Sequence, residues 1–270
     1  MKRWGKVLLS VVMMLGLAGC AKDGTVKESR VQEVAIPTAE ELIAKITEAS
    51  EGLSSFVQES QSWLNTDMAQ GENQVNSTSE TQSTSEYALN PLQMHQVSRL
   101  NVSGQDEQDM EIYLVEAGYF TLFNGYWRKM PETMLEAIKV PFQLAASPKE
   151  RMKQFKTILP YLMVTEEGDD YVLTARASGE QMKDLKAYYE VQYSGVESPE
   201  QLIAAVKSMS TMYSVDKQTY WPTWTEDEMV TDDRKDGQGM YTVMKMKSTI
   251  GKYNTLSKIE VPEEALSAQR

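Results

Sequence analysis

The sequence predicts an α+β fold built around an antiparallel sheet. Strand-like segments come in runs, one before residue 130 and one after residue 209, and helical patterns gather between them. A parallel doubly wound sheet would instead alternate single strands with helices. Two turn signals also join neighbouring strands directly, Asn124-Gly125 between two aromatic segments and the acidic turn at 166–170. Connections this short pair strands antiparallel.

The N-terminus has the layout of a secretory signal peptide. Residues 1–19 begin with three basic side chains, continue with an apolar run at 7–17 and end on Ala-Gly. The run is too short to remain in a bilayer as a spanning helix. Residues 17–20, Leu-Ala-Gly-Cys, resemble a bacterial lipobox, which implies cleavage before Cys20 and a lipid attached to its sulfur. An ordinary signal peptide with an incidental cysteine is the alternative.

Charge and cysteine content limit the kind of partner. The chain carries a net charge of −12, and without residues 1–19 it has 24 basic against 39 acidic residues, a net charge of −15. Such an acidic chain lacks the basic face that nucleic acid or an anionic lipid surface requires. Cys20 is the only cysteine, so no disulfide can form within the chain. We therefore expect no nucleic-acid partner, and a protein held to the extracytoplasmic face of the cell membrane through an N-terminal lipid anchor.

Ordered structure is predicted to begin at Thr38. Residues 20–37 are predicted to be a lipidated Cys followed by a flexible tether, because the residues after Cys20 are polar and aperiodic. Thr38 and Glu41 have the spacing of a capping box, in which each side chain satisfies a free amide of the first helical turn. Leu42 and Ile46 then begin an apolar stripe at helical spacing.

Strand signals dominate from residue 54 to residue 130. Residues 73–89 place Val, Ser, Thr and Tyr on one parity and mainly Glu and Gln on the other, which favours a long, mostly solvated strand. Low-complexity disorder is the alternative for this segment. Further on, Asn124-Gly125 favours the positive φ angles of a type I′ hairpin turn.

Helical patterns return between residues 132 and 160. The first helix is expected to end at Pro141, because proline has no N–H to donate. A second helix has Ser147 as its N-cap. Its apolar stripe consists of Met152, Phe155 and Leu159. Two more capped helices, at 178–191 and 198–209, precede a final run of strands that extends to about residue 266.

No residue pattern points to catalysis, a metal or a cofactor. His95 is the only histidine, and strand alternation predicts that it faces solvent. With Cys20 assigned to lipid, neither a Cys/His site nor a zinc spacing remains. The turn at 166–170 lacks the twelve-residue pattern of a calcium loop, no pair of carboxylates stands out, and there is no glycine-rich phosphate loop. We therefore expect a protein that is not an enzyme and needs no cofactor.

The 17 methionines are a further feature of the sequence. Eight of them fall on helix stripes or in the late strands: Met152, Met182, Met209, Met212, Met229, Met240, Met244 and Met246. The flexible methionine side chain fills irregular apolar space, which suits a cavity that accepts acyl chains. A loosely specified core would use the same residues equally well.

Four segments occur in a characteristic order: ELIAKITEASEGLSSF, IYLVEAGYFTLFNGYWRKMP, VDKQTYWPTW and YNTLSKIEVPEEAL. In this order they resemble the LolA-like superfamily, and within it the small exported lipoproteins of Gram-positive bacteria. The matching positions are Asp216, Lys217, Thr219, Tyr220, Pro222, Tyr253, Asn254, Ile259, Pro262 and Glu263. The resemblance implies one LolA-like domain over 38–270. Its fold would be a strongly curved antiparallel sheet, an incomplete barrel, with helices covering the concave face.

The resemblance also implies a function. In several relatives an apolar cavity between sheet and helices carries lipid or acyl chains, so we expect a hydrophobic ligand of this kind here. The predicted lining residues are Leu42, Ile46, Met152, Phe155 and Leu159. The alternative is a protein–protein interaction module at the cell surface with no small-molecule ligand, which an exposed cluster of tryptophans would favour. The four tryptophans in question are Trp63, Trp127, Trp221 and Trp224.

Overall fold

A computed structural model describes residues 35–70, 73–192 and 199–268. Residues 36–270 form one compact unit. The predicted signal peptide, Cys20 and most of the predicted tether lie outside the described residues. Within the described ranges, no helix is long and apolar enough to cross a membrane.

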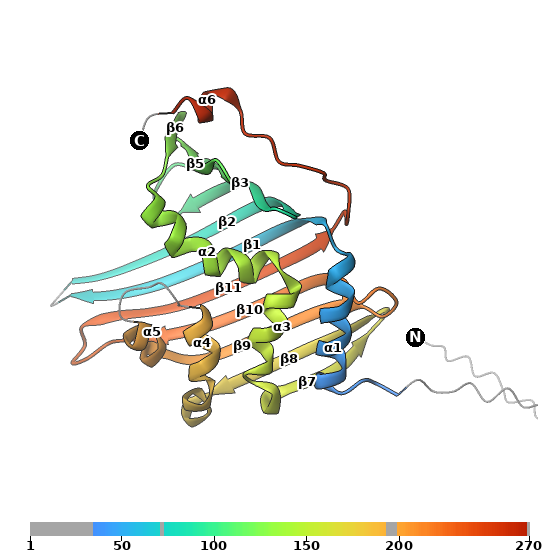
Figure 1. The fold of residues 1–270 in the computed structure, drawn as a ribbon. Helices are drawn as coiled ribbons and strands as arrows, with labels where there is room; N and C mark the ends of the chain where they lie inside the picture. The colour runs from blue at the N-terminus through green and yellow to red at the C-terminus, as the bar shows by residue number, and fades with distance from the viewer. Residues whose placement is uncertain (1–34, 71–72, 193–198, 269–270) are drawn as a thin grey trace, which may run out of the picture. The chain divides into compact units, whose positions relative to one another are not determined.

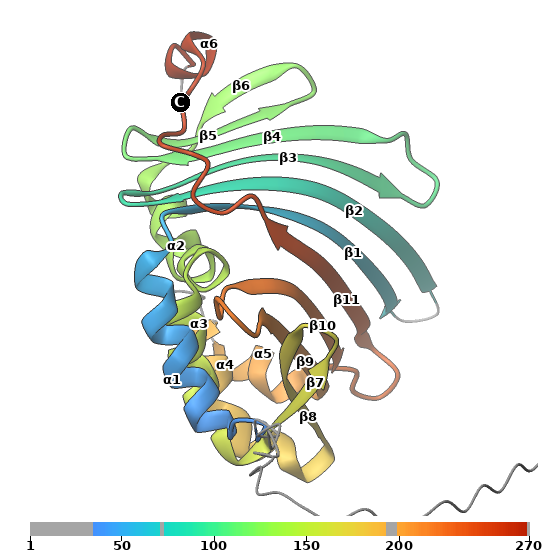
Figure 2. The ribbon, with the colours of Figure 1, turned by 90° about the vertical axis from the view of Figure 1, so that its right-hand side faces the viewer.

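Eleven strands of the described chain form one antiparallel sheet (Figure 1). The strands are β1 (Ser55–Gln70), β2 (Asn73–Leu89), β3 (Leu92–Val102), β4 (Gln108–Val115), β5 (Gly118–Phe123), β6 (Tyr126–Lys129), β7 (Leu162–Glu167), β8 (Asp170–Ser178), β9 (Val206–Asp216), β10 (Pro222–Asp232) and β11 (Gly239–Gly251). Their order is β6-β5-β4-β3-β2-β1-β11-β10-β9-β8-β7, so β6 and β7 are free edges and the sheet does not close. Figure 2 shows its strong curvature. The predicted fold class, an α+β protein with a strongly curved, open antiparallel sheet, is confirmed.

The helices are α1 (Ala39–Ala49), α2 (Glu132–Ala146), α3 (Pro148–Lys156), α4 (Lys186–Gln192), α5 (Pro199–Ala205) and α6 (Glu263–Leu266). Short 3-10 turns span Ser50–Gly52, Leu159–Tyr161 and Gly179–Leu185. Helices α1 to α4 lie on the concave side of the sheet, and α6 lies beside β6 (Figure 2). Two N-terminal caps are formed as predicted: Thr38 and Glu41 make the reciprocal capping box of α1, and Ser147 accepts a hydrogen bond from the Glu150 amide at the start of α3.

The ends of two predicted helices are wrong. Helix α2 does not end at Pro141 but continues to Ala146. Leu135 and Phe142, on either side of the proline, both pack against the core, and this burial offsets the missing hydrogen bond. Helix α5 ends at Ala205, because the pattern that continues to residue 209 already belongs to β9.

The segment after β11 is not a strand, contrary to the prediction. Lys252 and Asn254 have φ angles of 51° and 58°, in the left-handed region that ends an extended strand. The Asn254 amide donates to the Ser55 carbonyl of β1 at 2.8 Å, but the chain then runs along the convex face of the sheet without forming a further strand. The Leu256 amide donates to the Ser55 hydroxyl at 3.0 Å. Further on, Ile259 and Ala265 are buried in an apolar cluster with Tyr113 and Phe120.

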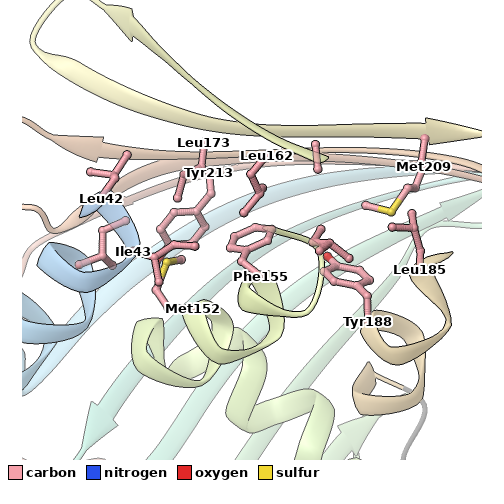
Figure 3. Packing of buried hydrophobic residues seen from close by; sticks show 14 of the residues in the cluster. Leu42, Ile43, Met152, Phe155, Leu162, Leu173, Leu185, Tyr188, Met209 and Tyr213 are labelled. Carbon is pink, nitrogen blue, oxygen red and sulfur yellow. The ribbon is translucent and has the colours of Figure 1, made fainter. Parts of the chain in front are cut away.

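The main core lies between the concave face and the helices (Figure 3). Strand alternation supplies one wall, because side chains two residues apart point to the same face. Leu173 of β8 and Tyr213 of β9 belong to this wall, and both are buried. Leu42 of α1 and Phe155 of α3 pack onto it from the helix layer. A second cluster, under α2, contains Phe56 with its neighbours on β2 to β4.

Candidate functional site

A cavity of about 230 Å³ lies between the concave face of the sheet and helices α2, α3 and α4. The sheet lines it mainly with Met209, Tyr213, Met229, Met244, Met246 and Ile250, and the helices line it with Leu144, Ala145, Pro148, Arg151, Tyr188 and Tyr189. Apart from Arg151, these side chains are apolar or aromatic, and the sheet adds a smaller polar part made of Gln58, Ser210, Thr225, Asp227 and Glu228. The cavity is therefore a mostly apolar space bounded by two different layers of the fold.

Strand register brings the methionines of the cavity together. Met209 of β9 is directly opposite Met229 of β10, and Met229 is directly opposite Met244 of β11. Met246 follows Met244 by two residues and so points to the same face. The sequence singled out these four residues as cavity or core residues, and the structure places all four around the cavity. Their flexible thioether side chains can adjust to ligands of different shapes.

Arg151 is the charged group of the helix wall. Its guanidinium donates to Asp227 Oδ1 at 3.1 Å, to Gln154 Oε1 at 2.9 Å and to Thr211 Oγ1 at 3.3 Å. The same guanidinium lies 5.0 Å from the ring centroid of Phe155. The side chains of Arg151 and Asp227 are only 16% and 21% exposed. The charge is therefore neutralised inside the protein and joins α3 to β9 and β10.

The polar atoms around the cavity are satisfied within the protein. In the ranges that the structure describes, no buried side-chain nitrogen or oxygen lacks a hydrogen-bond partner. Burial raises the pKa of the Tyr213 hydroxyl, against the opposing effect of the Arg151 charge, so the phenol stays neutral. A polar ligand would find these groups already bonded, whereas an apolar group needs only shape and the exclusion of water. The arrangement suits an apolar ligand.

The five residues predicted to line a cavity lie in the main core. Leu42, Met152 and Phe155 are completely buried there (Figure 3). Ile46 is completely buried in the same cluster, and Leu159 packs against it. None of the five lines the 230 Å³ cavity. The prediction that they line a ligand cavity therefore stays a prediction, and Cys20 lies outside the described residues. The sequence analysis missed Arg151, which falls one helical turn before Phe155 and so on the inward side of α3.

The convex face of the sheet carries a larger and more open trough of about 740 Å³. By strand alternation most of its side chains, which include Glu59, Gln61 and Trp224, point away from the helices. Its charges pair with one another, as in the 2.9 Å contact between Lys247 and Glu226. In the described part of the chain, no group of three or more His, Cys, Asp or Glu residues could hold a metal ion. We interpret the trough as a solvated sheet face.

His95 is partly buried rather than facing solvent as the alternation predicted. Its Nδ1 lies 3.0 Å from Glu86 Oε2, its Nε2 lies 2.9 Å from Glu111 Oε1, and its side chain is 21% exposed. The ring stacks on Tyr113 with 4.4 Å between centroids. The Tyr113 hydroxyl donates to the same Glu111 oxygen at 2.9 Å. His95 thus ties β2, β3 and β4 together on the convex face, away from the cavity.

The four tryptophans do not form an exposed cluster, and each is partly buried. Trp127 packs with Tyr113 on the convex face. Trp221 lies against Tyr253, and its indole donates to the Ala49 carbonyl at 3.2 Å. Trp63 is directly opposite Lys245 of β11 and Trp224 is directly opposite Thr249, so the two tryptophans are four residues apart along the sheet. The arrangement that would favour an interaction module is therefore not present among the described tryptophans.

Three crystal structures illustrate what the chain is similar to. LprF from Mycobacterium bovis matches with a TM-score of 0.41 and 8% identity, over 84% of this chain and 99% of that chain. A LolA superfamily protein from Nitrosomonas europaea matches with 0.23 and 9%, over 86% and 98%. A DUF1329 family protein from Desulfovibrio piger matches with 0.26 and 8%, over 81% and 93%. At these TM-scores the likenesses carry no argument on ligand or activity.

No curated protein matches the chain. A family profile does, and it covers the chain from the first residue of the α1 capping box to the C-terminus. This profile, described as a family of unknown function, DUF6612, matches residues 38–270, and the chain belongs to that family.

Proposed function

We propose that this protein is a membrane-anchored, extracytoplasmic lipoprotein that binds a hydrophobic ligand, a lipid or an acyl chain, and catalyses no reaction. Residues 1–19 are the signal peptide, 20–37 the lipidated Cys and tether, and 38–270 the ligand-binding domain. The observation that carries the proposal is the methionine-lined cavity between sheet and helices, whose polar neighbours are already paired.

The physical argument rests on the cost of empty space. Protein interiors are packed nearly as densely as organic crystals, so side chains normally close on one another. The main core beside α1 and α3 does so, with side chains that are completely buried. Next to this core, the layers leave a space at Met229, Met244 and Met246. A retained apolar space of this kind supports use by a ligand that fills it.

Filling the cavity should abolish ligand binding. Ala145 lines the cavity from α2 and is exposed, so Ala145→Trp puts an indole into the space without removing a core side chain. Excluding two methylenes of a chain lowers affinity by more than about tenfold, at roughly 0.8 kcal/mol for each. The measurement is uptake of a fluorescent fatty acid by the purified protein, with mass spectrometry of its organic extract.

The matched control is Ala187→Trp, an exposed alanine on α4 that does not line the cavity. It should bind as the wild type does. If both tryptophan variants take up the probe as well as the wild type, the ligand does not occupy this cavity. A wild type that neither co-purifies with lipid nor binds the probe contradicts the proposed function itself.

Anchoring depends on Cys20. Cys20→Ser removes the thiol that would accept the lipid, so we expect no incorporation of labelled palmitate and release of the protein from the membrane fraction. Ser29→Ala, in the predicted tether, is the control and should label normally. Equal labelling of wild type and Cys20→Ser would show that the lipid, if any, is attached elsewhere.

A further inference from the structure

The apolar surface of the concave face continues past the cavity toward the ends of the long strands. Leu64, Met68, Val75 and Met240 are 40%, 45%, 58% and 40% exposed, and they make up four of the eleven exposed large apolar side chains of the described residues. We call these four residues the distal strip. Single exposed apolar residues are ordinary on a protein surface, but a group of them on one face of one sheet is typical of a binding surface.

Strand register shows that the distal strip borders the cavity at Leu64 and resumes, after one row of hydroxyl side chains, at Met68, Val75 and Met240. Met244, which lines the cavity, is directly opposite Leu64 on β1. Farther along, Met68 is directly opposite both Met240 on β11 and Val75 on β2. All of them therefore point to the concave face. Thr66 and Thr242 lie between the two groups, with 3.5 Å between their hydroxyl oxygens.

On β1 and β2 the other face of the same strand ends is polar. Asn65 and Asp67 alternate with the distal strip on β1, and the Asn76 side chain on β2 donates to Asp67 at 2.6 Å, whereas β11 places Val243 and Tyr241 opposite Asn65 and Asp67. These ends of β1 and β2 thus have a partly apolar and a polar face, and Figure 2 shows helices α1 to α3 at the opposite ends of the strands. An alternating pattern of this kind normally means that the apolar face meets something other than water.

The cavity is too small for a long ligand. Its volume is about 230 Å³. Sites for complete small-molecule ligands usually enclose about 300–1,000 Å³. A long acyl chain that enters the cavity must therefore leave part of its length outside.

We propose that the distal strip binds the part of the acyl chain that the cavity cannot hold, so that the ligand is a long, single-chain amphiphile. The inference rests on the proposed function, because it extends the same site along the sheet. The chain positions outside the cavity lie on Leu64, Met68, Val75 and Met240, and one side of them is removed from water. Each such methylene then contributes about half as much binding free energy as a fully buried methylene.

The test is a chain-length series on the purified, delipidated full-length protein. Saturated fatty acids of about 8 to 18 carbons displace a fluorescent fatty acid, and the affinity is plotted against chain length. For the wild type we expect affinity to rise by about twofold per methylene past the length that fills the cavity. In the triple variant Leu64→Ser, Met68→Ser and Met240→Ser, affinity should follow the wild type for the short acids and then stop rising. At 16 carbons the two proteins should differ by more than about tenfold.

The control is Met163→Ser, at an exposed methionine on the edge strand β7. Strands β10, β9 and β8 separate β7 from β11, so Met163 lies far from the distal strip in the sheet order. It should match the wild type at every chain length. Normal binding of the short acids by the triple variant also shows that it is folded.

Each other outcome has a distinct meaning. If wild-type affinity stops rising at the same chain length as that of the triple variant, the distal strip does not contact the ligand, whereas the proposed function stands because the short acids still bind. If no acid binds at any length, the proposed function fails and the inference with it. If the triple variant keeps the full chain-length dependence but sediments as a smaller species than the wild type, the distal strip is an interface between two copies of the chain.

Discussion

Replacing Phe155 with alanine is expected to lower the free energy of unfolding by about 3–5 kcal/mol. The Phe155 ring is completely buried, with its centroid 5.9 Å from that of Tyr213 and 6.3 Å from that of Tyr188. Its removal sacrifices the apolar burial and leaves a space that these rigid neighbours cannot close. The measurement is urea unfolding of the purified protein. Phe123→Ala, at a phenylalanine that is 42% exposed beside the Asn124-Gly125 turn, is the control and should cost less than about 1 kcal/mol.

The size of this loss also separates two interpretations of α3. The sequence predicted Phe155 as a cavity-lining residue, whereas the structure places it in the closed core. A side chain that borders an open, solvent-filled space leaves no new void when it is shortened, so its truncation would cost about 1 kcal/mol or less. A loss that small would mean that the layers open beside α3, and that the ligand cavity reaches the residues named from the sequence.

The local parts of the fold could be predicted because their causes lie within a few residues. The α1 capping box depends on Thr38 and Glu41, and the hairpin between β5 and β6 depends on Asn124 and Gly125, whose φ angles of 52° and 78° confirm the predicted turn. Segment ends were less predictable. Pro141 is a strong local signal for a helix end, but the packing of α2 against the sheet outweighs it, and packing is a property of the whole fold.

The candidate site shows the same division. The strand methionines were singled out because they fall in the late strands and methionine fills irregular apolar space, and Met209, Met229 and Met244 lie opposite one another across three strands. No sequence pattern shows where two apolar layers close and where they stay apart, since a stripe such as that of α3 fits both cases. The sequence therefore indicated apolar layers that face each other, whereas the position of an open space between them depends on the packing of the whole fold.

Replacing Arg151 with methionine is expected to lower the free energy of unfolding by about 3 kcal/mol. The substitution removes the cation but keeps an apolar side chain of similar length. Asp227 then remains a carboxylate that is 21% exposed, without its 3.1 Å ion pair and beside an apolar cavity. Breaking one side of a partly buried pair costs more than the pair contributes, because the remaining charge is poorly solvated. Arg176→Met, at an exposed arginine on β8, is the control and should change stability by less than about 0.5 kcal/mol.

The double variant Arg151→Met/Asp227→Leu decides what the ion pair does. Removing both charges leaves no isolated carboxylate, so most of the stability lost in the single variant should return. If Arg151 is only a structural link between α3 and β10, the double variant should also bind a fatty acid as tightly as the wild type. Recovery of stability without recovery of binding would show that the guanidinium exchanges Asp227 for an anionic ligand group. In that case the site would recognise the charged end of its ligand as well as the chain.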